Sequence, residues 1–486
     1  MDSESFIFYS VYIYTMTFIR YHTYGNQEYA YEVTSYWDKE KQTSRQKTKY
    51  LGVVIDKQKH IFEKRWQTKP EKLILDFGDS YIIDQFFEQS GFSDLLNAIF
   101  GTSKNIVLSL IYYRLCHNAA MMYAEQWFEG NYIRKKFIDM DLSSQRVSEY
   151  LMSLANEITQ RKFFEEYTKR FSHSKRGVII DGTSLPNQIH NPMTTWGRSG
   201  EEIDKQVRFL LAVDRDEHLP LFFRLLPGNI IDVSSLQNTL YELKNYGVKD
   251  AYVLLDAGFF SEENIRDMFE NNIDFVVRLP SGRILYKELI KKEGATLESK
   301  KNLVRYGKRG LFVKEVEIDL LGKKTFAYVV QDPLRRGREM TRYILDSVED
   351  EVIQDDENYE IINKGIMVVV SSFRIPKDEI VPFYYIRQTA EVFFGFSKDD
   401  LAILPLRVHS HEGIRGFIFL QFLTLIAFTQ LKNKLGKSYT VDEVLLSMRN
   451  LKCKVYDNEI LINEITKEQR EMAEKLGVLV PKNLGI

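Results

Sequence analysis

Two short apolar runs, each followed at once by an aspartate, constrain the fold of this chain most strongly. Residues 177–184 read GVIIDGTS and residues 251–260 read AYVLLDAGFF, which places Asp181 and Asp256 directly after their apolar runs. Short runs of this kind, bounded by small residues, are typical of strands buried inside a sheet. An acid at the end of a strand often only caps the next turn. The neighbouring elements must therefore decide whether the two acids have a chemical role.

Hydrophobic periodicity predicts an α/β chain in six parts. After residue 173 the order is three strands, a helix, a strand, a helix and a strand, which suits a mixed sheet flanked by helices. The six predicted parts are an N-terminal β unit (1–56), a helical region (57–172), the first part of a mixed-sheet domain (173–280), a segment of charged strands (281–370), the second part of that domain (371–436) and a C-terminal helical tail (437–486).

Composition excludes some classes of protein. The two cysteines, Cys116 and Cys453, form no CxxC pair, which argues against a disulfide framework or a structural zinc site and favours a reducing compartment. The apolar stretches 5–18 and 417–428 are too short to span a bilayer, and the first follows no basic region. We expect a soluble cytoplasmic protein without a membrane partner, in which Met16 is an alternative translation start.

Charge is segregated along the chain although the formal net charge is only −2. Residues 281–310 hold nine Lys or Arg against three Glu, and residues 346–360 hold eight Asp or Glu and no base. Basic residues also cluster at 39–49 and 134–136. A basic segment is usually only a solvated surface, but such clusters are also what a polyanionic partner requires.

One predicted helix in the helical region could also meet DNA. Ser143 or Ser144 is the expected N-cap, which places Gln145 and Arg146 in the first turn. A helix that begins in this way can enter a DNA groove, yet helices of this kind are as often part of a plain bundle. Both alternatives remain open.

The segment YYIRQTAEVFFGFSKDD, residues 384–400, carries a polar stripe on an otherwise apolar helix. On a helical wheel Tyr384, Arg387, Glu391 and Lys398 fall within an arc of about 60°, and aromatic and branched residues occupy the opposite side. A solvated face is the simplest explanation. The stripe also offers groups that bind phosphate, because arginine forms bidentate bonds to phosphate oxygens and a phenol donates a further one.

Asp181, Asp256 and Glu391 together supply three carboxylates that can converge at the edge of the sheet. Oxygen ligands of this kind suit Mg²⁺. Two such ions placed close together promote phosphodiester cleavage.

The spacing Tyr-x2-Arg-x3-Glu-x6-Lys resembles the YREK signature of the DDE transposases of bacterial insertion sequences, in the IS-four-like branch. Similar stretches include DGTSLPN, LLDAGFFSEENI and the early YEVTSYWDKEKQTSRQKTKYLG, and the resemblance covers most of residues 30–480. It implies a ribonuclease-H-like catalytic domain interrupted by a β-rich insertion, preceded by a small N-terminal β unit and a helical DNA-binding region.

The resemblance also implies roles for single residues. Asp181, Asp256 and Glu391 match the catalytic, metal-binding acids, which hold two Mg²⁺ ions, with Mn²⁺ as a substitute. Tyr384, Arg387 and Lys398 match DNA-binding positions. The implied partners are double-stranded DNA, namely transposon terminal inverted repeats and target DNA. A homodimer is implied on the paired DNA ends, in the cytoplasm at the bacterial nucleoid.

The sequence departs from the family at one point and leaves two alternatives open. Some members form a DNA hairpin that is stabilised by a tryptophan in the insertion, but the tryptophans here lie at 37, 66, 127 and 196. Phe312, Phe326 or Tyr328 can replace that ring. A nuclease of the same fold and a transposase-derived DNA-binding protein without activity are the alternatives to a transposase.

Overall fold

The structure is a computed structural model that describes residues 16–485 with internal gaps. The gaps are 26, 39–40, 64–72, 118, 172–176, 188–189, 200–201, 231, 249–250, 350–360, 389, 391–393 and 395–409. Contacts within the chain divide it into two units. The first comprises Met1–Leu73 with Lys454–Ile460, and the second comprises Ile74–Cys453 with Leu461–Ile486.

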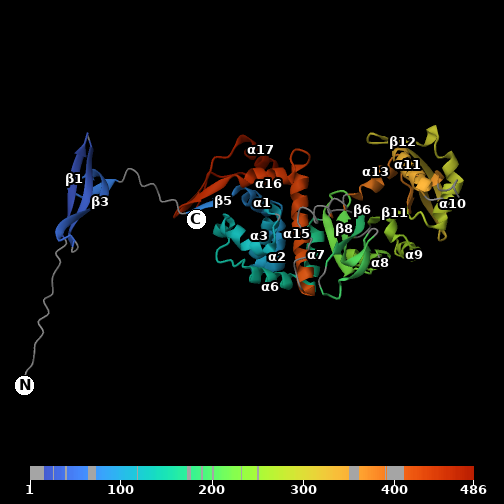
Figure 1. Cartoon of the computed structure of the whole chain (residues 1–486), viewed down its shortest axis with the longest axis horizontal. Helices are drawn as coiled ribbons and strands as arrows, with labels where there is room; N and C mark the ends of the chain where they lie inside the picture. The colour runs from blue at the N-terminus through green and yellow to red at the C-terminus, as the bar shows by residue number, and fades with distance from the viewer. Residues whose placement is uncertain are drawn as a thin grey trace, which may run out of the picture. The chain divides into compact units, whose positions relative to one another are not determined.

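The N-terminal unit is built on a four-stranded antiparallel sheet (Figure 1), with strand order β1-β2-β3-β4. Its strands are β1 (Met16–Tyr24), β2 (Gln27–Asp38), β3 (Thr43–Asp56) and β4 (Ile61–Glu63). The aromatic and β-branched residues of these segments favour strands. The sheet continues beyond residue 56 to Glu63, and no described helix belongs to this unit.

A bundle of short helices forms the first part of the second unit. It contains α1 (Gly78–Gln89), α2 (Phe92–Phe100), α3 (Lys104–Cys116), α4 (Ala124–Glu129), α5 (Ile133–Lys136), α6 (Ser144–Leu154) and α7 (Glu157–Phe171). Ser143 is the N-cap residue of α6 as predicted, although its side chain makes no capping hydrogen bond. Gln145 and Arg146 both contact Glu149 in the next turn.

A ten-stranded mixed sheet follows, with the order β12-β13-β14-β15-β11-β10-β6-β8-β7 and with β9 paired to β8. β6 and β11 flank β10 as parallel neighbours, and the remaining pairs are antiparallel. The strands are β6 (Gly177–Pro186), β7 (Thr195–Ser199), β8 (Glu202–Asp214), β9 (Pro220–Pro227), β10 (Tyr252–Leu255), β11 (Phe275–Leu279), β12 (Leu303–Tyr306), β13 (Arg309–Leu320), β14 (Lys323–Gln331) and β15 (Ile366–Ser371).

Four strands, rather than the predicted three, precede the first helix of this sheet. The missed strand is β7, whose sequence TWGRS has no apolar alternation because it lies on the outer edge of the sheet. The predicted turn after β8 is confirmed: Asp214 accepts backbone N–H groups of Asp216 and Glu217. The mixed sheet with helices is consistent with a ribonuclease-H-like fold.

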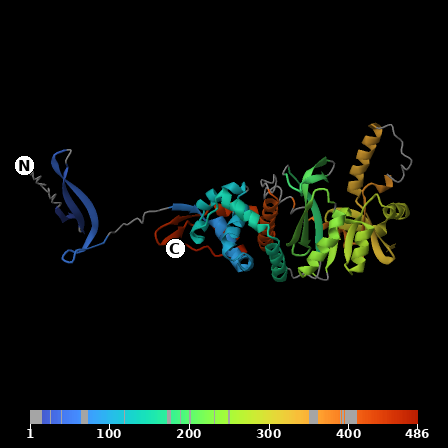
Figure 2. The ribbon, with the colours of Figure 1, turned by 90° about the horizontal axis from the view of Figure 1, so that it is seen from below.

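Residues 281–370 combine strands with two helices, α10 (Ile284–Glu293) and α11 (Pro333–Glu349) (Figures 1 and 2). The strands β12, β13 and β14 extend the main sheet through β15, because Val370 pairs with Val277 of β11 on one side and with Ala327 of β14 on the other. The segment is therefore joined to the central sheet by main-chain hydrogen bonds.

Further helical elements belong to the second unit. They are α8 (Asp232–Asn245), the 3₁₀ turn η3 (Ala257–Phe259), α9 (Glu262–Glu270), α13 (Ile380–Tyr385), α15 (His411–Leu435), α16 (Val441–Arg449) and α17 (Lys467–Leu476). A second small sheet has the order β18-β17-β16-β5, from β18 (Asn483–Gly485), β17 (Glu459–Ile462), β16 (Lys452–Val455) and β5 (Leu73–Asp76). Thr440 and Glu443 form the predicted capping box at the start of α16.

Helix α15 is the hub of this unit, because it contacts α3, α6 and β9. It is long and apolar enough to cross a membrane, as is the segment Phe92–Cys116, but 83% of its most apolar window is buried inside the protein. Phe92–Cys116 is interrupted by the 3₁₀ turn Gly101–Ser103. The predicted buried helix over 417–428 is confirmed.

Gly416 allows α15 to approach α6 closely. A Cβ atom at Gly416 would lie 1.6 Å from the carbonyl oxygen of Leu151. We predict that Gly416→Ala lowers the free energy of unfolding by at least about 1–3 kcal/mol, because the two helices must move apart. Gly337→Ala in α11 is the matched control, since a Cβ there meets no atom within 4 Å.

Alanine in an exposed helix is intrinsically favoured over glycine by roughly 0.5–1 kcal/mol, so the control should be neutral or stabilising. Denaturant unfolding of both variants measures the difference. Equal free energies of unfolding for the two variants would show that the close approach of α15 to α6 does not contribute to stability.

Candidate active site

Parallel pairing of β6 and β10 brings the two aspartates to one edge of the sheet. Ile180 of β6 pairs with Leu255 of β10, and Asp181 and Asp256 are the next residues on the two strands. Neighbouring strands lie about 4.8 Å apart, and residues in register point to the same face. The sheet therefore presents the two carboxyl groups side by side.

Strand β6 does not end at Asp181, contrary to what its sequence predicts. It continues to Pro186, because Asp181 itself pairs with Leu211 of β8 in an antiparallel ladder. Only the parallel pairing with β10 stops at Ile180. Asp181 is thus held by regular backbone hydrogen bonds, and its position is more rigid than that of a loop residue.

The possibility that the acids only cap turns is wrong for Asp256. Asp256 is the N-cap residue of η3, but its side chain makes no capping hydrogen bond. It accepts a hydrogen bond from the phenol of Tyr384 instead, with an oxygen–oxygen distance of 3.3 Å. Asp181 has a local role as well, because its Oδ1 accepts the backbone N–H of Gly182 at 2.9 Å.

Arg387 contacts both acids with one guanidinium group. Its Nη1 lies 2.7 Å from Oδ2 of Asp181, and its Nη2 lies 3.9 Å from Oδ1 of Asp256. The side chains of Arg387 and Asp181 are only 13% and 11% exposed. A cation is therefore already held where the two carboxylates meet.

Aromatic stacking on both sides of Tyr384 fixes the helix α13. Phe383 stacks on Tyr252 of β10 with ring centroids 5.2 Å apart, and Tyr385 stacks on Tyr306 of β12 at 5.6 Å. The intervening Tyr384 is buried and points to Asp256. The stacking contacts within residues 382–386 thus hold the Tyr384 phenol where it donates a hydrogen bond to Asp256.

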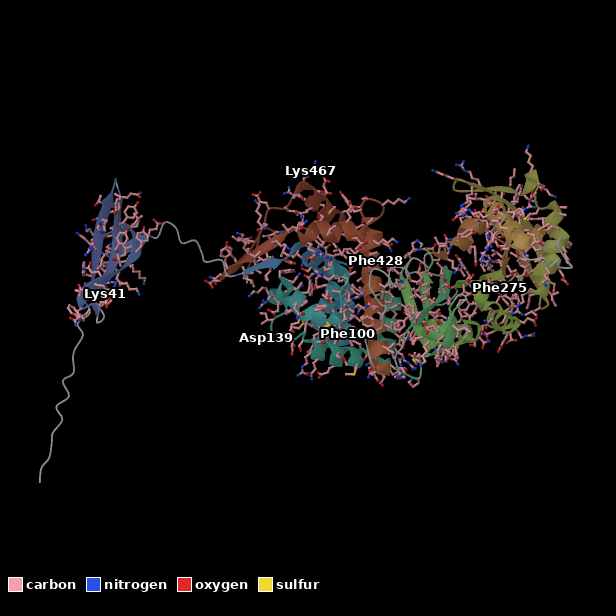
Figure 3. All side chains as sticks on the ribbon, viewed as in Figure 1. Lys41, Phe100, Asp139, Phe275, Phe428 and Lys467 are labelled. Carbon is pink, nitrogen blue, oxygen red and sulfur yellow. The ribbon has the colours of Figure 1, made fainter. Side chains whose placement is uncertain are left out.

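Tyr384 keeps its proton at any physiological pH. Burial raises the pKa of the Tyr384 phenol, and the nearby charge of Asp256 raises it further, against the opposing effect of Arg387 and Arg278. Tyr384 is therefore a hydrogen-bond donor to Asp256. Arg278 was not identified from the sequence as a residue near the site. The signal that could have found it is its position as the single charged residue in the apolar run FVVRL of β11, which starts at Phe275 (Figure 3).

Of the six predicted site residues, Asp181, Asp256, Tyr384 and Arg387 meet in the structure. Glu391 and Lys398 lie outside the described residues. A merely solvated stripe is excluded for Tyr384 and Arg387, because both are largely buried and contact the acids. The helix predicted through this segment is interrupted, since α13 ends at Tyr385 and a turn at 386–387 follows.

Comparison with known proteins agrees with this geometry. Residues 172–427 match the model of the family described as transposase DDE domain, which is more than half of the chain. The chain belongs to this family. No significant match was found among curated proteins.

Solved structures similar to this chain include one described as a piggyBac transposase synaptic complex with hairpin DNA. The TM-score is 0.39 and the sequence identity is 10%, over 76% of this chain and 70% of the other.

DDE transposases use divalent metal ions, and the oxygen donors of this site fit such an ion. Asp181 and Asp256 supply hard carboxylate oxygens, and Arg387 shows that the pair attracts positive charge. Over the part of the chain that the structure describes, which omits 391–393 and 395–409, no group of three His, Cys, Asp or Glu side chains could hold a metal ion. The third expected ligand, Glu391, is in an omitted segment.

Removal of Arg387 should make the transposase more dependent on divalent ions for its stability. Loss of one partner from a buried ion pair costs roughly 3–5 kcal/mol, because Asp181 keeps its charge in a largely buried position. A bound ion stabilises the folded state by mass action. We therefore predict that Arg387→Ala lowers the melting temperature, and that Mg²⁺ or Mn²⁺ raises it more in the variant than in the wild-type transposase.

Arg374→Ala is the control, because this 71% exposed arginine pairs with Glu315 at the surface. An exposed pair contributes only about 0–1 kcal/mol. Thermal melting with and without the ion measures both effects. An ion-induced shift of equal size in Arg387→Ala and the wild type would show that Arg387 does not occupy the region where the ion binds.

Proposed function

We propose that this chain is a cut-and-paste transposase of the IS-four-like branch, with the YREK signature at Tyr384, Arg387, Glu391 and Lys398. It binds the terminal inverted repeats of its element, cleaves the DNA and joins the freed 3′ ends to target DNA. One observation carries the proposal: two strand-borne carboxylates converge on a single guanidinium that is itself part of the signature. A solvated surface or a turn cap requires no such convergence.

The three acids Asp181, Asp256 and Glu391 form the catalytic set in this proposal. Residues 173–280 supply the aspartates, and residues 371–436 supply the glutamate and the signature. These three acids would hold two Mg²⁺ ions, or Mn²⁺ in their place, and the ions would supply activation of the attacking oxygen and stabilisation of the leaving oxygen. The strands β6 and β10 hold the aspartates in a fixed register, so the acids need little rearrangement when DNA arrives.

Arg387 and Tyr384 have two functions in succession. Without DNA, Arg387 balances the charge of the aspartates and Tyr384 orients Asp256. When a DNA end binds, the guanidinium offers its N–H groups to a phosphate, for which its planar shape is suited. Lys398 adds charge beside the same strand. Arg387 thus connects the aspartates with the groups that bind the phosphate.

The basic segments differ in their exposure to solvent. Within 134–136, Arg134 pairs with Glu129, and Lys136 lies 2.7 Å from an oxygen of the buried Asp84. All nine basic residues of 281–310 are exposed, although Arg309 also pairs with Asp332, and this segment belongs to the same unit as the acids. We propose that 281–310 provides most of the phosphate contacts on that unit, with 39–49 on the other.

The working form is proposed to be a homodimer that pairs two DNA ends, in the cytoplasm at the bacterial nucleoid. We propose a dimer because a transposable element has two ends, and both ends must be cut and joined. The alternatives differ in their products: a nuclease of the same fold cuts without joining, and an inactive DNA-binding protein does neither.

Substitution of the acids tests the proposed chemistry. We predict that Asp181→Asn, Asp256→Asn and Glu391→Gln each reduce Mg²⁺-dependent cleavage of DNA carrying the element's ends by on the order of 10²-fold or more, since even outer-shell changes cost about 10–100-fold. DNA affinity should persist, because each change removes a negative charge near phosphates. Cleavage and joining are followed on labelled end DNA, and binding is measured on the same DNA.

Asp346→Asn on α11 is the matched control, because its carboxylate is 66% exposed and pairs only with the exposed Arg342 among the described contacts. Normal cleavage by either aspartate variant means that the catalytic acids lie elsewhere. Cleavage without joined products by the wild-type protein identifies the nuclease alternative.

A further inference from the structure

One face of the N-terminal sheet carries a row of aromatic rings. In an antiparallel pair, directly opposite residues lie on the same face, and residues alternate between faces along each strand. The register places the rings of His22, Tyr24, Tyr29, Tyr31, Trp37 and Tyr50 on a single face. The row crosses β1, β2 and β3.

The rings of this aromatic face touch one another. His22 meets Tyr31 edge to face at 5.5 Å, Tyr31 meets Tyr50 at 5.3 Å, and Tyr24 meets Tyr29 at 5.9 Å. Phe18 lies on the same face beneath the guanidinium of Arg20, which is 5.4 Å from the ring centroid. The rings of His22, Tyr24, Tyr29, Tyr31 and Tyr50 thus form one continuous surface with a cation at its border. Trp37 lies on the same face, six residues beyond Tyr31 along β2.

The aromatic face is open to its surroundings. Tyr24 is 65% exposed and Trp37 is 57% exposed. In the described part of this unit from residue 16 to 63, only Ala30, Val33 and Val53 are buried hydrophobic residues. A sheet normally needs one face packed against other apolar groups. An open aromatic face of this size indicates a binding surface.

The opposite face of the same sheet carries both signs of charge: Lys49 lies opposite Glu32, and Arg45 pairs with Asp38 at 3.3 Å. Arg45, Lys47 and Lys49 alternate along β3, and all three are exposed. Lys41 lies in the turn between β2 and β3 (Figure 3). The aromatic face, with Arg20 at its border, is therefore the surface that suits a partner combining flat aromatic groups with negative charge.

The chemistry of the rings distinguishes between possible partners. A second copy of the sheet is the competing occupant, because tyrosine and tryptophan are also enriched at protein interfaces. Tyrosine, histidine and tryptophan offer π faces with polar edges. Unpaired bases stack on such rings without regard to sequence, whereas bases in a duplex are already stacked on each other.

We propose that this aromatic face binds single-stranded DNA by stacking its bases on Tyr24, Trp37 and the rings between them. Arg20, the cation at the border of this face, contacts a phosphate. The choice of DNA over other polyanions rests on the proposed transposase function; the choice of an unpaired strand rests on the exposed rings. The site adds a contact for an opened strand, separate from the duplex contacts of residues 281–310.

The test compares two double variants in the full-length protein. Tyr24→Ala/Trp37→Ala removes two rings that are more than half exposed, so folding should be preserved. Tyr24→Phe/Trp37→Phe keeps an aromatic ring at both positions. Affinity for a dye-labelled oligothymidylate, about 15 nucleotides long to cover the usual site size, is measured by fluorescence anisotropy, with a duplex of equal length beside it.

The alanine variant should lose at least about tenfold in affinity for the single strand, because each stacked base contributes roughly fivefold to a hundredfold. Its affinity for the duplex should stay within about twofold, because residues 281–310 are unchanged. The phenylalanine variant should keep most of the single-strand affinity. Tyr241→Ala, a control at a 67% exposed ring on α8, should bind like the wild type.

Unchanged single-strand affinity in the alanine variant overturns the proposal. A variant that loses only self-association in sedimentation also overturns it, because the partner is then a second copy of the chain. A variant that loses only melting temperature overturns it as well, because another segment of the same chain then packs on the aromatic face. Asp256→Asn should bind the single strand normally. Failure of the catalytic proposal is therefore distinguishable from failure of this one.

Discussion

The parallel register of β6 and β10 is the constraint on which the rest of the site depends. It forces two carboxylates to lie side by side at one edge of the sheet, where their charges repel. The repulsion is balanced by Arg387, which spans both acids. Charge balance of this kind explains why a largely buried arginine stands next to the acids, a position that hydrophobic burial alone would not favour.

Three parts of the chain position the two aspartates and the residues that contact them. The strands supply the acids, α13 supplies Tyr384 and the neighbouring turn supplies Arg387. Two aromatic stacks, Phe383 on Tyr252 and Tyr385 on Tyr306, fix α13 against both the central strands and residues 281–370. The insertion-like segment is thus connected to the acids through Tyr385. A DNA contact on that segment would have a short physical route to the two aspartates.

Much of this arrangement could be predicted from the sequence, because the relevant signals are local. Buried strands show as apolar runs, which located β6 and β10, and a capping box located the start of α16. Tyr384 and Arg387 are three residues apart, which predicts that they share one side of a helix. Both contact the acids in the structure, although α13 ends at Tyr385 and Arg387 lies in the turn that follows.

Other features depend on contacts between distant residues and could not be predicted. Nothing local shows that β6 continues past Asp181, because its partner Leu211 lies thirty positions away. The edge strand β7 has no periodic pattern, and Arg278 gains its meaning only from the position of Tyr384. The charge pairing of Lys136 with Asp84 likewise requires two helices to meet. Sequence thus predicts elements better than it predicts which charges are already paired.

We infer that Asp181 and Asp256 form one cation site, which the guanidinium of Arg387 fills in the protein without metal. The most direct test is a crystal structure of the protein with Mn²⁺, using anomalous scattering to locate the ion. We expect an anomalous peak in contact with carboxylate oxygens of both Asp181 and Asp256, with the guanidinium of Arg387 moved away from Asp181. A bound ion that contacts neither aspartate, with the Arg387–Asp181 pair intact, would contradict this inference.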